Sequence, residues 1–351
     1  MTERIISVGI LGAGYISTVA HLPSFARVKQ AQLAAICDEN ESIAREVASR
    51  FRIPKVYSKL EDMLANEQLE FVDVCLPPHF HTTAVKRIIN QGCNVLVEKP
   101  LTISTADADS LIQLAKDKKV KLFVLHNYSA VPSLIHAKEL VAKGLIGDVI
   151  GVNINHFVTP VERYLEPSHW NHKLPGEYFS EMLPHLTMLL VEFLGPTKQV
   201  QATAARISNM PLKYDEMRII AQTDKGLGSI NISLNCPVFI LTVDIIGTKG
   251  QISVSGDYQA VVLRRQISTE AGALTRGMFG VKDILARSSA LASTSLGVLL
   301  GKYAPYIQGH RHLIQQCVAD LQGKGTYPID TSLARESVRL TEMVFNQISH
   351  S

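Results

Sequence analysis

The sequence has few of the features that mark disulfide-rich, membrane-spanning or nucleic-acid-binding proteins. Its five cysteines are scattered singly over 351 residues with no Cys-x-x-Cys pair, which argues against a disulfide framework or a thiolate metal site and favours a reducing compartment. No apolar run reaches the roughly 18–20 residues that cross a bilayer. The net charge is only +3, and no block of five like charges occurs. We therefore expect a cytoplasmic protein with no transmembrane segment and no nucleic-acid partner.

The composition is that of an ordinary globular protein, 46% hydrophobic and 19% charged, at about twice the usual domain length. In the first third, short apolar runs alternate with helical patterns. Continuous Val/Ile/Leu runs are typical of strands covered on both faces, so the pattern predicts parallel β-α-β units. The expected strands are 5–11, 31–38, 71–77, 94–100 and 121–126, and the expected helices are 16–28, 41–50, 81–92 and 104–118.

The pattern changes near residue 127. A helix is expected at 132–143, followed by consecutive strands that turn signals connect, and this order predicts an antiparallel sheet in an α+β domain. Residues 272–300 carry sparse cations on an apolar background and fit either a helix packed on the open sheet face or an amphipathic helix on a membrane or partner. The expected strands are 149–158, 199–207, 217–223, 227–234, 239–246, 250–254 and 259–264.

The segment Gly12-Ala13-Gly14-Tyr15-Ile16-Ser17 follows the first strand and opens a helix. This is a dinucleotide fingerprint with its third glycine replaced by serine: the first glycine permits a tight turn and the second lets the backbone approach a pyrophosphate. Asp38 ends the second strand, where an acid binds a ribose 2′-hydroxyl and repels a 2′-phosphate, which favours NAD over NADP. The alternative is a glycine turn with a solvated aspartate. The predicted cofactor-binding residues here are Gly12, Gly14, Tyr15, Ile16 and Asp38.

The run Val95-Leu96-Val97 ends abruptly in Glu98-Lys99-Pro100. Ligands of doubly wound sheets bind at the carboxyl ends of the strands, which is where this charged pair stands. A lysine ammonium there can polarise a carbonyl or hold a developing alkoxide, Glu98 would offset its desolvation, and Pro100 would fix the backbone, in cis or in trans. The plainer reading of the pair is a surface ion pair.

With the fingerprint and "VDVCLPPHFHTTAVKRIINQGCNVLVEKPLT" (72–102) together, the chain resembles the glucose–fructose oxidoreductase, inositol dehydrogenase and MocA-type (Gfo/Idh/MocA) family. The resemblance covers nearly the whole chain. It implies an N-terminal Rossmann domain, residues 1–126, and a C-terminal α+β domain with a mostly antiparallel open sheet, residues 127–351. It places Pro77 and His81 beside the nicotinamide, Glu98 at the cofactor ribose or the lysine, and Lys99 at the reacting hydroxyl.

The same resemblance makes His185 an acid/base residue, since imidazole titrates near neutrality, and pairs it with Glu181. The family carries an Asp-x-x-x-His here, whereas this chain has glutamate first and Leu183-Pro184 before the histidine. Because proline is tolerated at the first position of a helix, we expect a helix over 184–194 with Leu183 outside it, which would separate Glu181 from His185. The alternative is a buried structural histidine.

Substrate-facing residues are expected in two stretches. The "HNYSAVP" segment (126–132) matches a family position that lines the pocket, and "ERYLEPSHWNHK" (162–173) is a polar loop with the only tryptophan. The candidates are Asn127, Tyr128, Arg163, Trp170 and His172. No metal site is predicted, because the histidine pairs 79/81 and 169/172 lack clustered carboxylate or cysteine partners.

The sequence thus predicts an NAD-dependent oxidoreductase that acts on a secondary alcohol of a sugar, cyclitol or sugar nucleotide, or on the matching ketone. Lys99, His185 and Glu181 are its expected catalytic residues. Two alternatives remain open: a cofactor-binding regulatory or scaffold protein that has lost the chemistry, and a redox-neutral enzyme with tightly held NAD. The resemblance also implies a homodimer or homotetramer formed through the C-terminal sheet.

Overall fold

The structure is a computed structural model that describes residues 4–257, 259–265 and 305–349, with single positions 278, 280, 281, 284, 285, 288, 289 and 292 between them. Most of segment 272–300 therefore lies outside the described residues. The chain divides into two compact units, Met1–Ala130 with Tyr306–Arg339 and Val131–Pro305 with Leu340–Ser351. Among the helices of the described residues, none has the length and apolar character of a membrane span.

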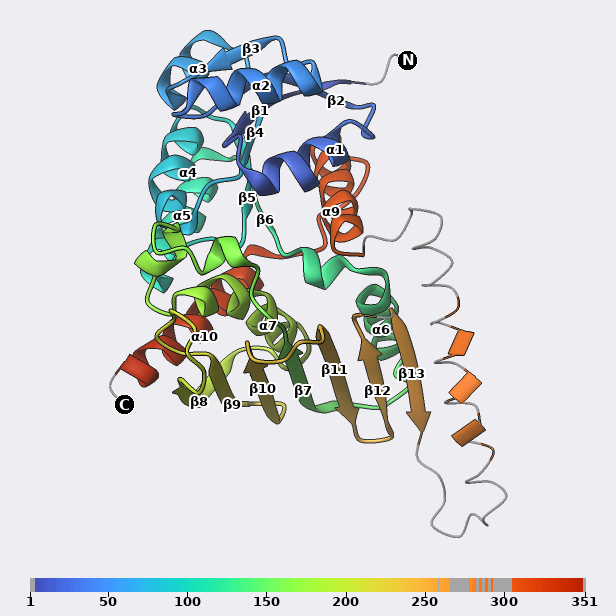
Figure 1. Ribbon diagram of the computed structural model, residues 1–351. Coiled ribbons are helices and arrows are strands. Elements are labelled where there is room, and N and C mark those ends of the chain that lie inside the picture. The colour runs from blue at the N-terminus through green and yellow to red at the C-terminus, as the bar shows by residue number, and fades with distance from the viewer. Residues whose placement is uncertain are drawn as a thin grey trace. The chain divides into compact units, whose positions relative to one another are not determined.

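The first unit is built on a six-stranded parallel sheet with the order β3-β2-β1-β4-β5-β6 (Figure 1). The strand order reverses at β1, which pairs with both β2 and β4. The carboxyl ends of the strands around such a reversal are where open α/β sheets bind ligands. The strands are β1 (Ile6–Leu11), β2 (Ala31–Cys37), β3 (Lys55–Tyr57), β4 (Phe71–Val74), β5 (Asn94–Glu98) and β6 (Leu122–Leu125).

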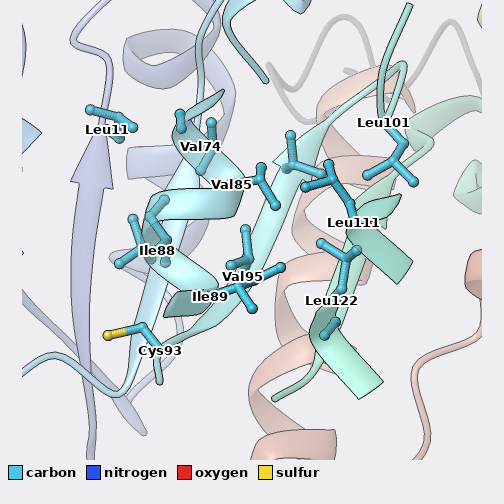
Figure 2. Packing of buried hydrophobic residues seen from close by; sticks show 14 of the residues in the cluster. Leu11, Val74, Val85, Ile88, Ile89, Cys93, Val95, Leu101, Leu111 and Leu122 are labelled. Atoms are coloured by element: carbon cyan, nitrogen blue, oxygen red, sulfur yellow. The ribbon is translucent and has the colours of Figure 1, made fainter. Parts of the chain in front are cut away.

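Helices cover this sheet, and they bury β1, β4, β5 and β6 along most of their length. Val85, Ile88 and Ile89 of α4 lie against Val74 and Val95 of the sheet, as Figure 2 shows. Local capping sets two of the helix starts, since the side chains of Asn40 and Ser104 accept main-chain N–H groups of α2 and α5. The helices are α1 (Leu22–Phe25), α2 (Glu41–Phe51), α3 (Leu60–Asn66), α4 (His81–Asn90), α5 (Thr105–Lys118), α9 (Pro305–Leu321) and the start of α10 (Thr331–Ser349).

The second unit contains a seven-stranded sheet with the order β13-β12-β11-β7-β10-β9-β8 (Figure 1). Its pairings are antiparallel except for β7 with β10. One face is covered by α7, so closely that a methyl group on Gly228 would lie 2.6 Å from Leu190. The elements are α6 (Pro132–Ala142), β7 (Val149–Phe157), α7 (Tyr178–Leu194), β8 (Thr197–Ala205), β9 (Glu216–Thr223), β10 (Leu227–Ser233), β11 (Ile240–Gly247), β12 (Gly250–Ser255) and β13 (Ala260–Arg265).

The structure confirms the expected fold class, a Rossmann doubly wound parallel sheet followed by an α+β unit with a mostly antiparallel sheet. The short elements β3 and α3 and the C-terminal helices α9 and α10 were not among the sequence-based expectations. The division of the chain also differs from the expected domains 1–126 and 127–351. Residues 306–339 return to the first unit, where Ala334 and Val338 of α10 join the core around β4 and β5.

Candidate active site

The glycine turn after β1 has the conformation that its glycines require. Gly12 has φ +102°, and a methyl group built on it would lie 2.5 Å from the carbonyl oxygen of Cys75. A methyl group built on Gly14 meets nothing within 4 Å. The turn leads directly into a helix that begins at Tyr15 and continues through a π-helical stretch, Ser17–His21, into α1. Gly12 thus makes the tight turn, and the backbone at Gly14 is open to a phosphate group.

Asp38, directly after β2, ties the end of that strand to the glycine turn. One carboxylate oxygen accepts the N–H of Ala13 at 2.8 Å, and the other accepts the N–H of Asn40 at 2.9 Å. Each carboxylate oxygen has about two acceptor sites, so both oxygens can also accept a ribose hydroxyl. The open glycine turn, the helix that begins directly after it and an acid at the end of β2 fit a bound NAD.

Lys99 directly follows β5 and is 7% exposed, beside Glu98 at 5%. Glu98 Oε2 accepts the main-chain N–H of Lys99 at 3.0 Å. Glu98 Oε1 lies 2.8 Å from Nε2 of His21 and 3.3 Å from Nε2 of His310. The Lys99–Pro100 peptide bond is cis. Glu98 therefore anchors the backbone of the lysine and points into a buried group of histidines.

The charge state of Glu98 follows from these contacts. Burial alone would raise the pKa of Glu98, but its contacts with His21 and His310 hold the pKa well below its usual range. Glu98 is thus ionised at neutral pH, and its carboxylate is a fixed negative charge at the end of the central strands.

His81, the first residue of α4, is fully buried, and both of its ring nitrogens contact main-chain oxygens. Nδ1 lies 2.8 Å from the carbonyl of Pro100, and Nε2 lies 2.8 Å from the carbonyl of Leu76. Burial lowers the pKa of His81. The ring thus connects the two loops that follow β4 and β5, and Pro77 lies in the first of them, just before the short helix Pro78–Phe80.

Sequence reasoning did not select three buried histidines of the first unit, His21, His126 and His310. His126 follows β6 and is 1% exposed, and its ring nitrogens have no hydrogen-bond partner among the described residues. Burial lowers the pKa of His126 to about 3, so the ring is neutral. The sequence signal for His126 is its position, since it ends an apolar strand next to Asn127. His21 and His310 carry no comparable signal, because both lie within helical segments.

Helix α7 of the second unit begins earlier than the sequence predicted. α7 begins at Tyr178 and includes Leu183, so the prediction of a helix starting at Pro184 is wrong. Pro184 lies in the second turn, where its missing N–H removes one intrahelical hydrogen bond, and burial of most of the helix outweighs that loss. Glu181 and His185 consequently stand one turn apart on the same helix, with His185 7% exposed.

The substrate candidates fall in two different units. Asn127 and Tyr128 are buried in the first unit: Asn127 donates to the carbonyl of Tyr306 at 3.4 Å, and the Tyr128 and Tyr306 rings lie 4.7 Å apart. Their surroundings are thus set by α9.

In the second unit, Arg163, Trp170 and His172 lie in short 3-10 turns before α7. The guanidinium of Arg163 lies 4.8 Å from the ring centroid of Tyr164 and donates to its hydroxyl, while His172 Nδ1 is 4.0 Å from Glu177 Oε1. The ring of Trp170 is 5.1 Å from that of His169. This loop therefore gathers cationic, aromatic and carboxylate groups next to the start of α7.

Among the described residues, two buried groups bring potential metal-ligand atoms within 4.8 Å of one another: His21 with Asp73 and Cys75, and His21 with Glu98 and His310. The closest of these atoms are 2.8 Å apart. Ligand atoms on one tetrahedral zinc ion stand about 3.3 Å apart, as bond lengths near 2.0 Å require. The short contacts are those of hydrogen bonds, so the sequence-based expectation of no metal site stands as our proposal.

Comparison with known proteins bears on the class of this chain. Residues 6–126 match the family described as "Oxidoreductase family, NAD-binding Rossmann fold", and residues 134–253 match the GFO/IDH/MocA C-terminal domain. The first of these matches places an NAD-binding Rossmann domain of an oxidoreductase family in this chain. It belongs to the Gfo/Idh/MocA family, as its glycine turn and Glu98-Lys99-Pro100 segment indicated.

Individual relatives are more distant. An oxidoreductase of Formosa agariphila is 28% identical over 204 residues, 57% of this chain and 64% of that protein. The D-xylose 1-dehydrogenase (NADP(+)) 2 of Haloferax volcanii is 33% identical over 147 residues, 42% of this chain and 45% of that protein. The chain thus spans less than two thirds of the length of both.

Among solved structures, the WlbA dehydrogenase from Bordetella pertussis in complex with NADH and UDP-GlcNAcA superimposes with a TM-score of 0.80 at 21% identity. The match covers 100% of this chain and 97% of that one. At that identity the likeness shows the fold alone.

Proposed function

We propose that this protein is a dehydrogenase or reductase that transfers a hydride between NAD and a secondary alcohol, or the matching ketone, of a sugar, cyclitol or sugar nucleotide. The observation that carries the proposal is a buried lysine, Lys99, at the carboxyl end of a central Rossmann strand, with its backbone fixed by the ionised Glu98. The names of a D-xylose dehydrogenase relative and of a UDP-GlcNAcA complex with the same fold support the sugar class.

In this proposal the chain supplies a cation and a proton-transfer group, and bound NAD supplies the hydride acceptor or donor. The ammonium of Lys99 holds the substrate oxygen as its negative charge develops. His185 takes the hydroxyl proton in oxidation and returns it in reduction, and Glu181, one turn earlier on α7, orients the ring or stabilises its protonated form.

We assign cofactor binding to the backbone at Gly12 and Gly14, to the start of the helix at Tyr15 and Ile16, and to the carboxylate of Asp38. The acid at position 38 favours NAD over NADP. Pro77 would line the nicotinamide side. His81, whose ring nitrogens both contact main-chain oxygens, would hold that loop rather than bind the cofactor directly, and Glu98 would do the same for Lys99.

For the substrate we propose Asn127 and Tyr128 in the first unit and Arg163, Trp170 and His172 in the second. The cationic and aromatic groups of the 162–173 loop suit sugar rings and a carboxylate or phosphate group. Self-association through the open face of the second sheet and a cytoplasmic location also remain proposals.

A screen of sugar nucleotides, cyclitols and aldoses with NAD, followed by variants, tests the function. Lys99→Ala and His185→Asn should each lower kcat by about 10²-fold or more, because each removes a group that acts in the transition state. NADH affinity, followed by fluorescence, should stay within about threefold. Lys116→Ala and His136→Asn, at exposed helix positions, are matched controls that should turn over normally.

Full turnover by the Lys99→Ala/His185→Asn double variant would contradict the assignment. NADH binding without turnover on any substrate class would favour a regulatory protein. Cofactor that survives gel filtration, with substrate converted and no net change in NADH, would favour a redox-neutral reaction.

A further inference from the structure

A line of three buried ionisable side chains runs beneath the end of β5. His21 Nδ1 lies 2.8 Å from Oδ2 of Asp73 on β4, and His21 Nε2 lies 2.8 Å from Oε1 of Glu98 on β5. His21 and Asp73 are fully buried, and Glu98 is 5% exposed. The π-helical stretch Ser17–His21, directly after the glycine turn, carries the histidine to this place.

Geometry and charge together set how many protons the line holds. At His81 both acceptors are neutral main-chain carbonyls and burial lowers the pKa, whereas at His21 both acceptors are carboxylates. A contact of 2.8 Å between a ring nitrogen and a carboxylate oxygen is a hydrogen bond only if a proton lies between the two atoms, since two lone pairs would repel. His21 has such a contact at each nitrogen. The line therefore holds two protons, one more than a neutral imidazole between two carboxylates provides.

We propose that His21 is a positioning residue, held as an imidazolium between Asp73 and Glu98, which keeps Glu98 ionised and in place so that Glu98 fixes the backbone of Lys99. The link to the lysine is direct, because the second oxygen of Glu98 accepts the N–H of Lys99 at 3.0 Å. The role in catalysis rests on the function proposed above, whereas the charge state of His21 does not.

The groups that surround His21 agree with this assignment. Burial alone would lower the pKa of His21, but its interactions with Asp73 and Cys75, of which the charge of Asp73 has the largest effect, raise the pKa well above its ordinary value. Cys75 lies 3.6 Å from Asp73, and burial raises the pKa of its thiol to about 12, so Cys75 is a neutral donor. From α9, His310 Nε2 lies 3.3 Å from Oε1 of Glu98, the oxygen that His21 also contacts, and the rings of the two histidines are 5.3 Å apart.

More distant titratable groups add little charge. Cys317 of α9 and Tyr327 are buried near Asp73, and burial raises the pKa of each, so both are neutral. Lys99, which follows Glu98 in the chain, adds a positive side chain to this region. The imidazolium of His21 thus offsets much of the negative charge that two buried carboxylates would otherwise leave uncompensated.

The first test is the ¹⁵N spectrum of the histidine rings in the NADH-free protein, with His21 assigned by its absence from the His21→Gln variant. We expect both ring nitrogens of His21 to carry protons throughout the range from pH 6 to pH 8. An unprotonated Nδ1 or Nε2 at pH 7 would overturn the proposal. So would one equivalent of zinc in the purified protein.

The second test uses charge-specific rescue. His21→Gln leaves two buried carboxylates without their cation and should lower the midpoint of thermal unfolding by about 10 °C. His21→Gln/Asp73→Asn removes one of those carboxylates and should regain at least half of the loss. If His21 only fills space, the losses measured for His21→Gln and for Asp73→Asn alone should add in the double variant. A double variant that is no more stable than His21→Gln would therefore contradict the proposal.

Catalysis is then read on the substrate that the screen identifies. His21→Gln should lower kcat by about tenfold with KM for NADH within about twofold, and the double variant should regain most of kcat. Spectrum and unfolding need no substrate, so they test the imidazolium even if the proposed reaction is wrong. If the spectrum shows an imidazolium and the double variant regains stability, but His21→Gln leaves kcat unchanged, only the link from His21 to Lys99 would be refuted.

Discussion

The two sheets of this protein accommodate polar side chains in opposite ways. In the parallel sheet, β4 and β5 are buried along almost their whole length, and Asp73 and Glu98 are charged residues within them. In the antiparallel sheet, strands such as β9 and β11 alternate between buried and more exposed positions, and polar residues such as Asp244 occupy the more exposed ones.

The partners differ in the same way. Asp73 and Glu98 meet a histidine carried by a separate helical segment, with solvent excluded. Asp244 of β11 accepts hydrogen bonds from Ser253 and Gln251 of the neighbouring strand, on a face that remains partly open. A charge in the first sheet thus depends on particular buried partners, whereas a charge in the second can exchange its partners for water.

The largest effect is expected for Glu98→Ala. The change leaves the buried His21 and His310 without their carboxylate and the N–H of Lys99 without its acceptor. Breaking a buried ion pair on one side costs about 3–5 kcal/mol, so the free energy of unfolding should fall by about that amount in urea titrations at pH 7.

The pH dependence provides the control. Because the folded state lowers the pKa of Glu98, its contribution to stability is present above the unfolded pKa of about 4.3 and is lost as pH falls through the lower folded value. The difference between wild type and Glu98→Gln should therefore shrink below about pH 4. A difference that stays constant between pH 7 and pH 3 would show that the charge of Glu98 is not what stabilises the fold.

The functional residues at the ends of the first sheet could be predicted from the sequence because their signals are local. Gly12 and Gly14 specify a turn at one point of the chain, and Glu98-Lys99 interrupts an apolar run where nothing else explains a charge. The contact between Glu98 and His21 could not be predicted, because it is not local. His21 is 77 positions away from Glu98 and 52 from Asp73, and only the folded sheet brings the three together.

α7 shows a different limit. Pro184 is a strong local signal for a helix start, and it misplaced that start by six residues, since α7 begins at Tyr178. Proline in the second turn loses a single hydrogen bond, and burial of residues on nearly all sides of α7 outweighs it. Tertiary packing of this kind cannot be read from a window of a few residues.

A smaller effect on stability is expected at the glycine turn, where two neighbouring glycines should differ. Gly12→Ala places a methyl group 2.5 Å from the carbonyl of Cys75 at φ +102° and should cost about 2 kcal/mol or more, with loss of NADH binding. Gly14→Ala meets no atom within 4 Å, so stability should change by no more than about 0.5 kcal/mol.

NADH affinity distinguishes a glycine needed for the turn from one needed for phosphate approach, because a methyl group at position 14 lies where the pyrophosphate approaches. The affinity for NADH should fall about tenfold or more in Gly14→Ala, a loss of about 1.4 kcal/mol. Unchanged affinity in Gly14→Ala would place the phosphates elsewhere.

The smallest effect is expected for Asp244→Ala in the second sheet. Ser253 and Gln251, which donate to its carboxylate at 2.6 and 3.1 Å, can turn to water on the partly open face, so the free energy of unfolding should fall by about 1 kcal/mol or less. Urea titrations at two protein concentrations, at least tenfold apart, measure it. A loss that grows at the higher concentration would mean that another copy of the chain covers this face, as the proposed self-association requires, because the variant would then also weaken the association that stabilises the folded chain. A loss as large as that of Glu98→Ala, at either concentration, would remove the distinction between the two sheets.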